Sequence, residues 1–150
     1  MQLSKNLSLL EFCQSNTADS KGIDNVIKDP THLENAKRLA ENVFQPLRDH
    51  LGKPIKVNSG YRSKALNKVI PGSSNTSQHC FGEAIDLDLH DKETFDWIID
   101  NLEFDQLIQE FPVNGNAKWF HISYREGRNR KEVLVSLKKA GKTVYTRYVR

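Results

Sequence analysis

The chain has 150 residues and a formal net charge of +3, and 37% of its residues are hydrophobic. This length suits one domain with its own core over 1–150, and the composition excludes a disordered chain. No apolar run approaches the roughly 20 residues of a membrane span, and an acid interrupts the apolar patch near the start where a secretory signal would need a continuous one. We therefore expect a monomer made in the cytoplasm without a signal peptide.

The first part of the sequence predicts two helices. Ser8 and Glu11 have the spacing of a capping box, which begins a short helix, and turn-rich residues follow over 15–22. A long amphipathic helix is predicted over 29–52, because apolar residues recur at helical spacing until a glycine ends the pattern. Pro46 lies inside this helix and should kink it, since proline removes one backbone hydrogen bond.

Short strands and helices follow. Period-two patterns predict strands at 55–58 and 83–89, and helical patterns predict helices at 64–69 and 92–102. The alternation within the second strand turns Asp86 away from the core. A short strand with one acidic face is therefore expected in the middle of the chain.

Two hairpins are predicted in the last part of the sequence. The strands of 104–125 meet across Asn114-Gly115, the dipeptide most favourable to a two-residue hairpin turn, and those of 132–148 meet at 140–141. Helices mixed with hairpins, without sustained strand–helix–strand alternation, predict an α+β fold with a small antiparallel sheet and flanking helices.

Charge and cysteine content suggest partners and compartment. Residues 122–150 hold nine lysines and arginines against two glutamates, a net of +7, so residues 1–121 carry −4. This favours an anionic partner such as a cell-wall polymer or a nucleic acid, although the solvated faces of a surface hairpin explain it equally well. Cys13 and Cys80 are expected to be free thiols, because cytosolic proteins rarely hold disulfides.

Three residues are candidate metal ligands. His79 lies in a loop, Asp86 lies on the polar face of the strand that follows, and His121 lies on a later strand, facing away from its most apolar row. Two histidines and one carboxylate leave one coordination position open, as catalytic zinc sites do, whereas structural sites are usually filled by four protein ligands. The spacing of the first two residues is by itself a weak signal.

A hydrolase of this design also needs a general base. With a two-residue turn in the first hairpin, Ile108 pairs with His121, and Glu110 lies diagonally across on the same face, about 7–8 Å away or somewhat less. A loop longer by one residue would reverse the facing and bring Asp105 to that face instead. The base is thus predicted to be Glu110, on condition that the turn is short.

An ordered set of motifs accompanies these residues: S-G-Y-R-S at 59–63, L-N at 66–67, S-Q-H-C-F-G-E-A-I-D at 77–86 and W-F-H-I-S at 119–123. Together they resemble the zinc D-Ala-D-Ala carboxypeptidase and L-alanyl-D-glutamate endopeptidase superfamily. Its members cut peptidoglycan peptides, and many are phage endolysins. The resemblance covers a motif core of 59–123, extends to the preceding helix, and implies a Hedgehog/D-Ala-D-Ala peptidase-like fold.

The resemblance also implies roles for individual residues. Zinc would be held by His79, Asp86 and His121. Arg62 and Ser77 are similar to the family residues that hold the substrate's carboxylate or polarise its carbonyl. Arginine suits that task because it stays charged and binds a carboxylate with two nitrogens.

One position departs from the family pattern. Many members carry the catalytic acid three residues before the last histidine, where this chain has Lys118. Residues 104–110 instead look like the strand that supplies a glutamate at the related zinc site of Hedgehog signalling domains, which again indicates Glu110. Glu83 ranks well below it, as a partner of Arg62 or another base.

Three functions are weighed. The leading hypothesis is a zinc peptidase acting on peptidoglycan stem peptides, as a phage endolysin released through a membrane lesion or as a lysin carried in a phage tail. Lys118 motivates the alternative of a catalytically silent zinc-containing binding module. A nucleic-acid binder is disfavoured because no base-reading motif is recognisable. The basic hairpin 126–150 is expected to hold anionic wall polymers.

Overall fold

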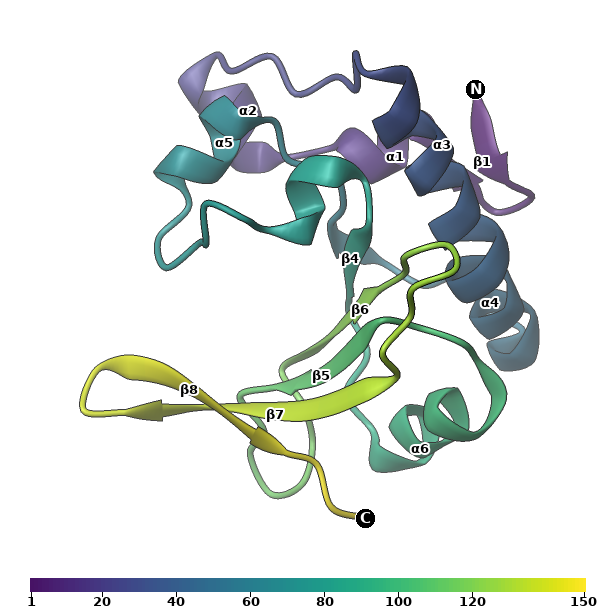
Figure 1. Ribbon diagram of the computed structural model, residues 1–150, viewed down its shortest axis with the longest axis vertical. Helices are drawn as coiled ribbons and strands as arrows, with labels where there is room; N and C mark the ends of the chain where they lie inside the picture. Colours follow the sequence, from purple (N-terminus) through teal and green to yellow (C-terminus); the bar gives the residue numbers. More distant parts are fainter.

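The long helical segment over 30–51 and the helix over 92–101 cover one face of a central sheet (Figure 1). The computed structural model describes all residues from Met1 to Arg150. The predicted α+β class is confirmed. Neither cysteine forms a disulfide, as expected. None of the helices combines the length and hydrophobicity that crossing a membrane requires.

The first 51 residues form β1 (Gln2–Ser4), β2 (Leu7–Ser8), α1 (Leu9–Cys13), α2 (Asn16–Lys21), α3 (Pro30–Leu39), the π-helical η1 (Ala40–Phe44) and α4 (Gln45–Leu51). The capping box is confirmed, since the Ser8 hydroxyl accepts a hydrogen bond from Glu11 N (3.0 Å). The first helix is short, as expected, and the turn-rich segment 15–22 contains a further short helix, α2, that was not predicted. Ser15 caps its start, accepting from Ala18 N, and Gly22 ends it with φ +64°.

The long helix is confirmed as one continuous path through α3, η1 and α4. It begins where the Asp29 side chain accepts from Thr31 N and ends at Gly52, with φ +65°. The expected disturbance at Pro46 takes the form of a π-helical turn directly before it, in which Gln45 N–H donates to Ala40 O. Such a wide turn accommodates a residue that cannot donate a backbone hydrogen bond.

The large sheet has the order β3-β4-β6-β5-β7-β8. Its strands are β3 (Val57–Ser59), β4 (Ala84–Leu87), β5 (Gln106–Glu110), β6 (Trp119–Ser123), β7 (Glu132–Lys139) and β8 (Lys142–Arg147), and the remaining helices are α5 (Lys64–Val69), the 3₁₀ helix η2 (Gln78–Phe81) and α6 (Lys92–Asn101). These elements confirm the strands and helices that the periodicity predicted, apart from shifts of a few residues at their ends.

The turn of the first hairpin is the predicted two-residue turn. Asn114 and Gly115 both have positive φ, +55° and +80°, as a type I′ turn requires. Ile108 consequently pairs with His121, and Glu110 pairs with Trp119. The register on which the general base was predicted is therefore confirmed.

The expectation of a purely antiparallel sheet was wrong at one pair. β5 and β7 run parallel, whereas all other neighbouring strands are antiparallel. The connection over 124–131 returns past the start of β5, where Glu132 N–H donates to Asp105 O (3.0 Å). The chain reverses direction after β6, so β7 runs opposite to β6. Since β5 also runs opposite to β6 and lies between β6 and β7, β7 is parallel to β5.

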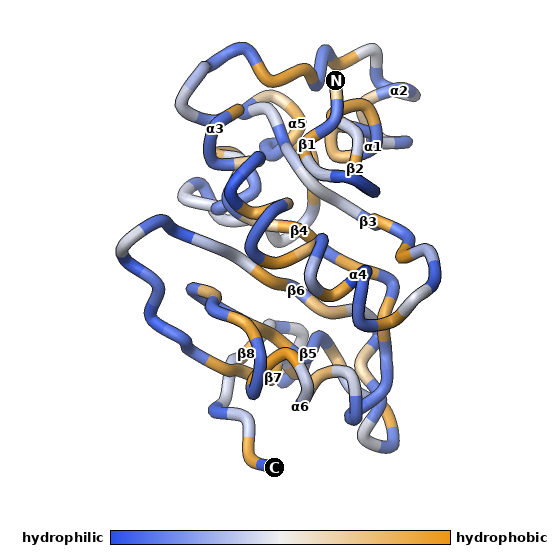
Figure 2. The backbone as a smooth tube through the Cα atoms, turned by 90° about the vertical axis from the view of Figure 1, so that its right-hand side faces the viewer, coloured by the Kyte–Doolittle hydropathy of each residue, from blue (hydrophilic) through white to orange (hydrophobic).

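The two faces of the sheet differ in chemistry. One packs into a core of 23 buried residues that includes Ile85 and Ile122 from the strands and Leu39 and Phe44 from the long helix. Figure 2 shows hydrophobic residues along α4 and along the central strands. The opposite face carries the polar residues of the predicted site, because side chains alternate between the faces of a strand.

Candidate active site

The three predicted ligands lie together at the junction of β4, β6 and η2. Asp86 and His121 are directly paired across the two strands. Asp86 Oδ1 is 2.9 Å from His121 Nδ1, and Asp86 Oδ2 is 3.3 Å from His79 Nε2. One ligand atom from each residue lies within 4.8 Å of the others. Two nitrogens and one carboxylate oxygen in such a cluster are a donor set that fits zinc.

A backbone contact sets the orientation of His79. Its Nδ1–H donates to the carbonyl oxygen of Gly60 at 2.7 Å, which leaves Nε2 to face Asp86. Hydrogen bonds from the other ring nitrogen to a backbone carbonyl fix the tautomer and the ring orientation of metal-binding histidines. A Cβ at Gly60 would collide with the backbone oxygen of Phe12, so only glycine fits there.

Two of the three candidate ligands favour the protonation state that binds a cation, whereas the contact with Asp86 outweighs burial and raises the pKa of His121, which favours its protonated form. Burial alone would raise the pKa of Asp86, but His79 and His121 outweigh burial and hold that pKa well below its usual value. Burial lowers the pKa of His79 and so favours its neutral form. An ionised carboxylate and a neutral imidazole are the forms that bind metals.

Arg62 lies at the edge of the cluster. Its Nη2 atom is 3.6 Å from Asp86 Oδ2, and its side chain is 15% exposed. Its Nε–H donates to Ser59 Oγ, and its backbone N–H donates to His79 O (3.0 Å). The guanidinium thus lies beside the three candidate ligands.

Ser77 has a clear structural contact. Its hydroxyl accepts from His79 N (3.3 Å) and caps η2, the element that carries His79. It is only partly buried. Its role in binding substrate stays a prediction.

Glu110 lies on the same sheet face as the ligands, on the strand next to that of His121. It is 9% exposed, and the Ser136 hydroxyl donates to its Oε1 at 2.6 Å. Burial raises the pKa of Glu110, and this outweighs the opposing effects of Ser136 and His121. Trp119, which pairs with Glu110 across the two strands, has a buried Nε1 without a hydrogen-bond partner.

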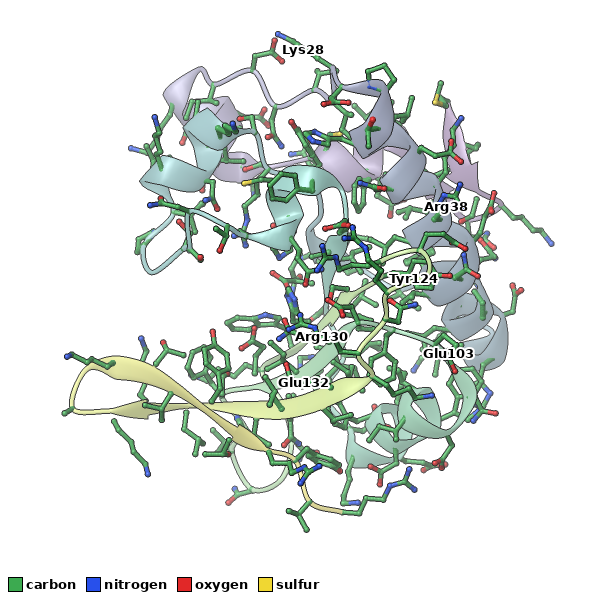
Figure 3. All side chains as sticks on the ribbon, viewed as in Figure 1. Lys28, Arg38, Glu103, Tyr124, Arg130 and Glu132 are labelled. Atoms are coloured by element: carbon green, nitrogen blue, oxygen red, sulfur yellow. The ribbon has the colours of Figure 1, made fainter.

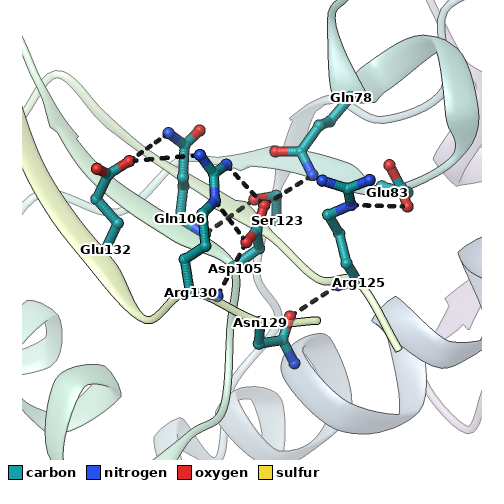
Figure 4. Close-up of polar contacts among 9 residues, drawn as sticks. All are labelled: Gln78, Glu83, Asp105, Gln106, Ser123, Arg125, Asn129, Arg130 and Glu132. Atoms are coloured by element: carbon teal, nitrogen blue, oxygen red, sulfur yellow. Dashed lines mark hydrogen bonds and ion pairs between the residues drawn. The ribbon is translucent and has the colours of Figure 1, made fainter. Parts of the chain in front are cut away.

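The other acids proposed from the sequence have different partners. Asp105 is fully buried and binds Arg130 through both carboxylate oxygens, at 2.9 Å each, while Gln78 Nε2 donates to it at 3.1 Å (Figure 4). Asp105 is therefore a structural residue and not the base. Glu83 lies 3.7 Å from Arg125, so the suggested pairing with Arg62 was wrong.

Two residues of the second hairpin extend this face and were missed. Ser136 pairs with Glu110 on one side and with Tyr145 on the other, so the three side chains share a face. Burial raises the pKa of Tyr145, and the charges of Glu110 and Asp86 raise it further. The alternation within the hairpin was visible in the sequence, but its pairing with β5 was not.

Comparison with known proteins agrees with the geometry. A family model described as Peptidase M15 matches residues 5–123. The chain belongs to the peptidase M15 family. This is the zinc D-Ala-D-Ala carboxypeptidase superfamily that the motifs indicated, and its peptidases are zinc-dependent. No curated protein matches the chain.

The part of the chain that matches the peptidase M15 model contains the complete set of candidate residues. It includes the three ligands, Arg62 and Glu110, and it ends with β6. The β7–β8 hairpin lies beyond the match. In this peptidase M15 chain, the hairpin nevertheless contributes Ser136 to the site.

Proposed function

We propose that this chain is a zinc peptidase that hydrolyses the stem peptides of peptidoglycan, at a D-Ala-D-Ala or an L-Ala-D-Glu bond, as a phage endolysin or tail-associated lysin. The peptidase M15 match supports a zinc-dependent metallopeptidase. The observation that carries the proposal is the placement of a buried carboxylate, Glu110, on the same sheet face as the His79–Asp86–His121 cluster.

The three clustered residues would hold the ion. Bound zinc supplies a Lewis acid that polarises the scissile carbonyl. Arg62 places a fixed positive charge beside the ligands, where it orients a substrate carboxylate. Ser77 is proposed to assist in orienting the substrate from the start of η2.

Glu110 would act as the general base. Its carboxylate takes a proton from the attacking water and returns it to the departing amine, so that the peptide bond breaks with protons balanced. A carboxyl with a raised pKa suits both halves of this transfer, because a general acid–base group works best when its pKa lies near the operating pH. Lys118 is exposed directly before β6 and cannot take this role.

The test couples metal analysis to turnover. Zinc per chain and the products released from purified peptidoglycan, identified by mass spectrometry, are measured for wild type and for Glu110→Gln, which keeps the size of the side chain and removes the base. Glu103→Gln is the matched control, because Glu103 is exposed beyond the end of α6 (Figure 3). We expect zinc in all three proteins and defined peptides from all but Glu110→Gln, and the product masses identify the bond.

A catalytically silent zinc-binding module is the second candidate, and Lys118 at the usual acid position favours it. If wild type and Glu110→Gln both hold zinc and neither releases peptides, this candidate replaces the peptidase.

A further inference from the structure

The β7–β8 hairpin contains one buried residue, and that residue points at the proposed base. Ser136 has no exposed surface, whereas every other residue of β7 and β8 is partly or fully exposed. It pairs with Glu110 in the parallel β5–β7 ladder, so both side chains lie on the face that carries the metal ligands. The hairpin follows the region that the family model matches.

Hydrogen bonds fix the direction of the Ser136 hydroxyl. Phe111 N–H donates to Ser136 Oγ at 3.1 Å, so the oxygen is already engaged as an acceptor. The hydroxyl proton then goes to Glu110 Oε1, 2.6 Å away. A charge-assisted bond of this length is among the stronger ones in proteins. It holds one carboxylate oxygen and leaves Oε2 to take up a proton.

The residue after Glu110 has an uncommon backbone conformation. Phe111 has φ +46°, in the left-handed region that residues other than glycine rarely adopt. This conformation occurs directly after the end of β5, and the Phe111 N–H donates to both the hydroxyl and the carbonyl oxygen of Ser136. Strained residues of this kind persist where the surrounding structure imposes them, often at functional sites.

We propose that Ser136 is a positioning residue for Glu110: its hydroxyl holds the carboxylate in the orientation that proton transfer requires. The inference rests on the proposed function. It assigns the hairpin a role in the chemistry, in addition to any electrostatic role of its lysines. Without the hydroxyl, the carboxylate is free to rotate and spends less time in the reactive orientation, so the turnover number falls while substrate binding is retained.

The experiment uses two side chains of nearly equal shape that differ in the hydroxyl. Ser136→Thr keeps the donor, and Ser136→Val replaces it with a methyl group. Both add the same bulk at a buried position, so any packing defect is common to them. Thr146→Val is the control, because Thr146 lies on the opposite face of the hairpin, where it pairs with Val135. Ser136→Ala removes the hydroxyl without adding bulk and serves if Ser136→Val fails to fold.

We measure kcat and KM for release of peptides from soluble peptidoglycan fragments, together with zinc per chain and the thermal midpoint. Loss of a hydrogen bond to a charged group predicts a fall in kcat of about 10- to 100-fold for Ser136→Val and Ser136→Ala, with KM and zinc content unchanged. Ser136→Thr and Thr146→Val should stay close to wild type.

Two results would overturn the inference. Equal losses for Ser136→Thr and Ser136→Val, with Ser136→Ala active, would show that only packing matters at this position. Unchanged kcat in the variants without a hydroxyl would show that Glu110 is positioned without it. A wild-type protein that holds zinc but releases no peptide would instead refute the proposed function itself.

Discussion

The β4–β6 pair and the β7–β8 hairpin belong to one sheet but differ in what holds them. All four residues of β4 are buried, whereas one of the eight residues of β7 and none of β8 are. The β4–β6 pair places Asp86 and His121 on packed strands. The hairpin adds the buried Ser136, while its lysines stay in solvent. A metal cluster needs the packed region, while the fine placement of one carboxylate can come from an exposed element.

Removing a candidate metal ligand from the packed β4–β6 pair should have the largest effect on zinc content and activity. Asp86→Asn takes away the negative charge between the two histidines, and we expect zinc to be lost and activity to fall below detection. Metal analysis and peptide release measure both. Asp88→Asn, in which the exposed neighbour is changed, is the control and should keep zinc. Stoichiometric zinc in Asp86→Asn would exclude the proposed ligand set.

The pH dependence of activity tests Glu110 as the base. Glu110 lies on β5, between the two regions. Glu110 must be deprotonated to accept a proton, and burial raises its pKa. Activity should therefore be lost as the pH falls through this raised pKa, at a higher pH than for an ordinary glutamate, whose pKa is about 4.3. The measurement is the acidic limb of kcat/KM with zinc kept saturating. A rate that stays level down to the usual glutamate pKa would contradict the assignment.

Gly60→Ala tests the hydrogen bond that orients His79 in the packed region. The added Cβ would collide with Phe12, displacing the carbonyl that accepts the hydrogen bond from His79. Loss of such a contact predicts zinc binding weaker by about 10- to 100-fold, measured by competition with a chelator. Gly72→Ala has open space around its Cβ and should leave zinc affinity unchanged, although its φ of +75° costs some stability. If Gly60→Ala binds zinc as tightly as wild type and Gly72→Ala, Gly60 does not orient His79.

Asp105→Asn separates stability from catalysis at the ion pair between Asp105, directly before β5, and Arg130. Asp105 joins η2 and β5 to Arg130, whose side chain is 53% exposed, so solvent screens part of the pair. We expect a loss of about 1–3 kcal/mol in the free energy of unfolding, measured with urea. Turnover of the remaining folded protein should change little. A large fall in kcat without a loss of stability would reinstate Asp105 as a catalytic group.

Charge reversal on the hairpin should have the smallest effect on the fold. Lys138 and Lys139 are exposed, so changing both to glutamate should leave the thermal midpoint and the hydrolysis of soluble fragments nearly unchanged. If the hairpin holds anionic wall polymers, lysis of whole walls should fall, and added salt should mimic the change because it screens exposed charges. Lysis that ignores both treatments would leave the lysines with no role in wall binding.

Much of this site follows from short-range patterns in the sequence. Asn114-Gly115 permits the positive φ values of a tight turn, and this turn alone decides that Glu110 shares a face with His121. Alternation within 83–89 places Asp86 on that face in the same way. Such features depend on neighbours a few residues apart, which is why periodicity and turn chemistry predict them.

Contacts between distant segments were decided only by the tertiary structure. The hydrogen bond from Ser136 to Glu110 needs β7 to lie parallel to β5, and that depends on the path of the connection over 124–131. The orientation of His79 likewise comes from a carbonyl 19 residues earlier in the chain. Period-two and helical patterns predict which side of a strand or helix is apolar, but they do not predict which other element packs against that side. Packing of the whole chain therefore chose these partners.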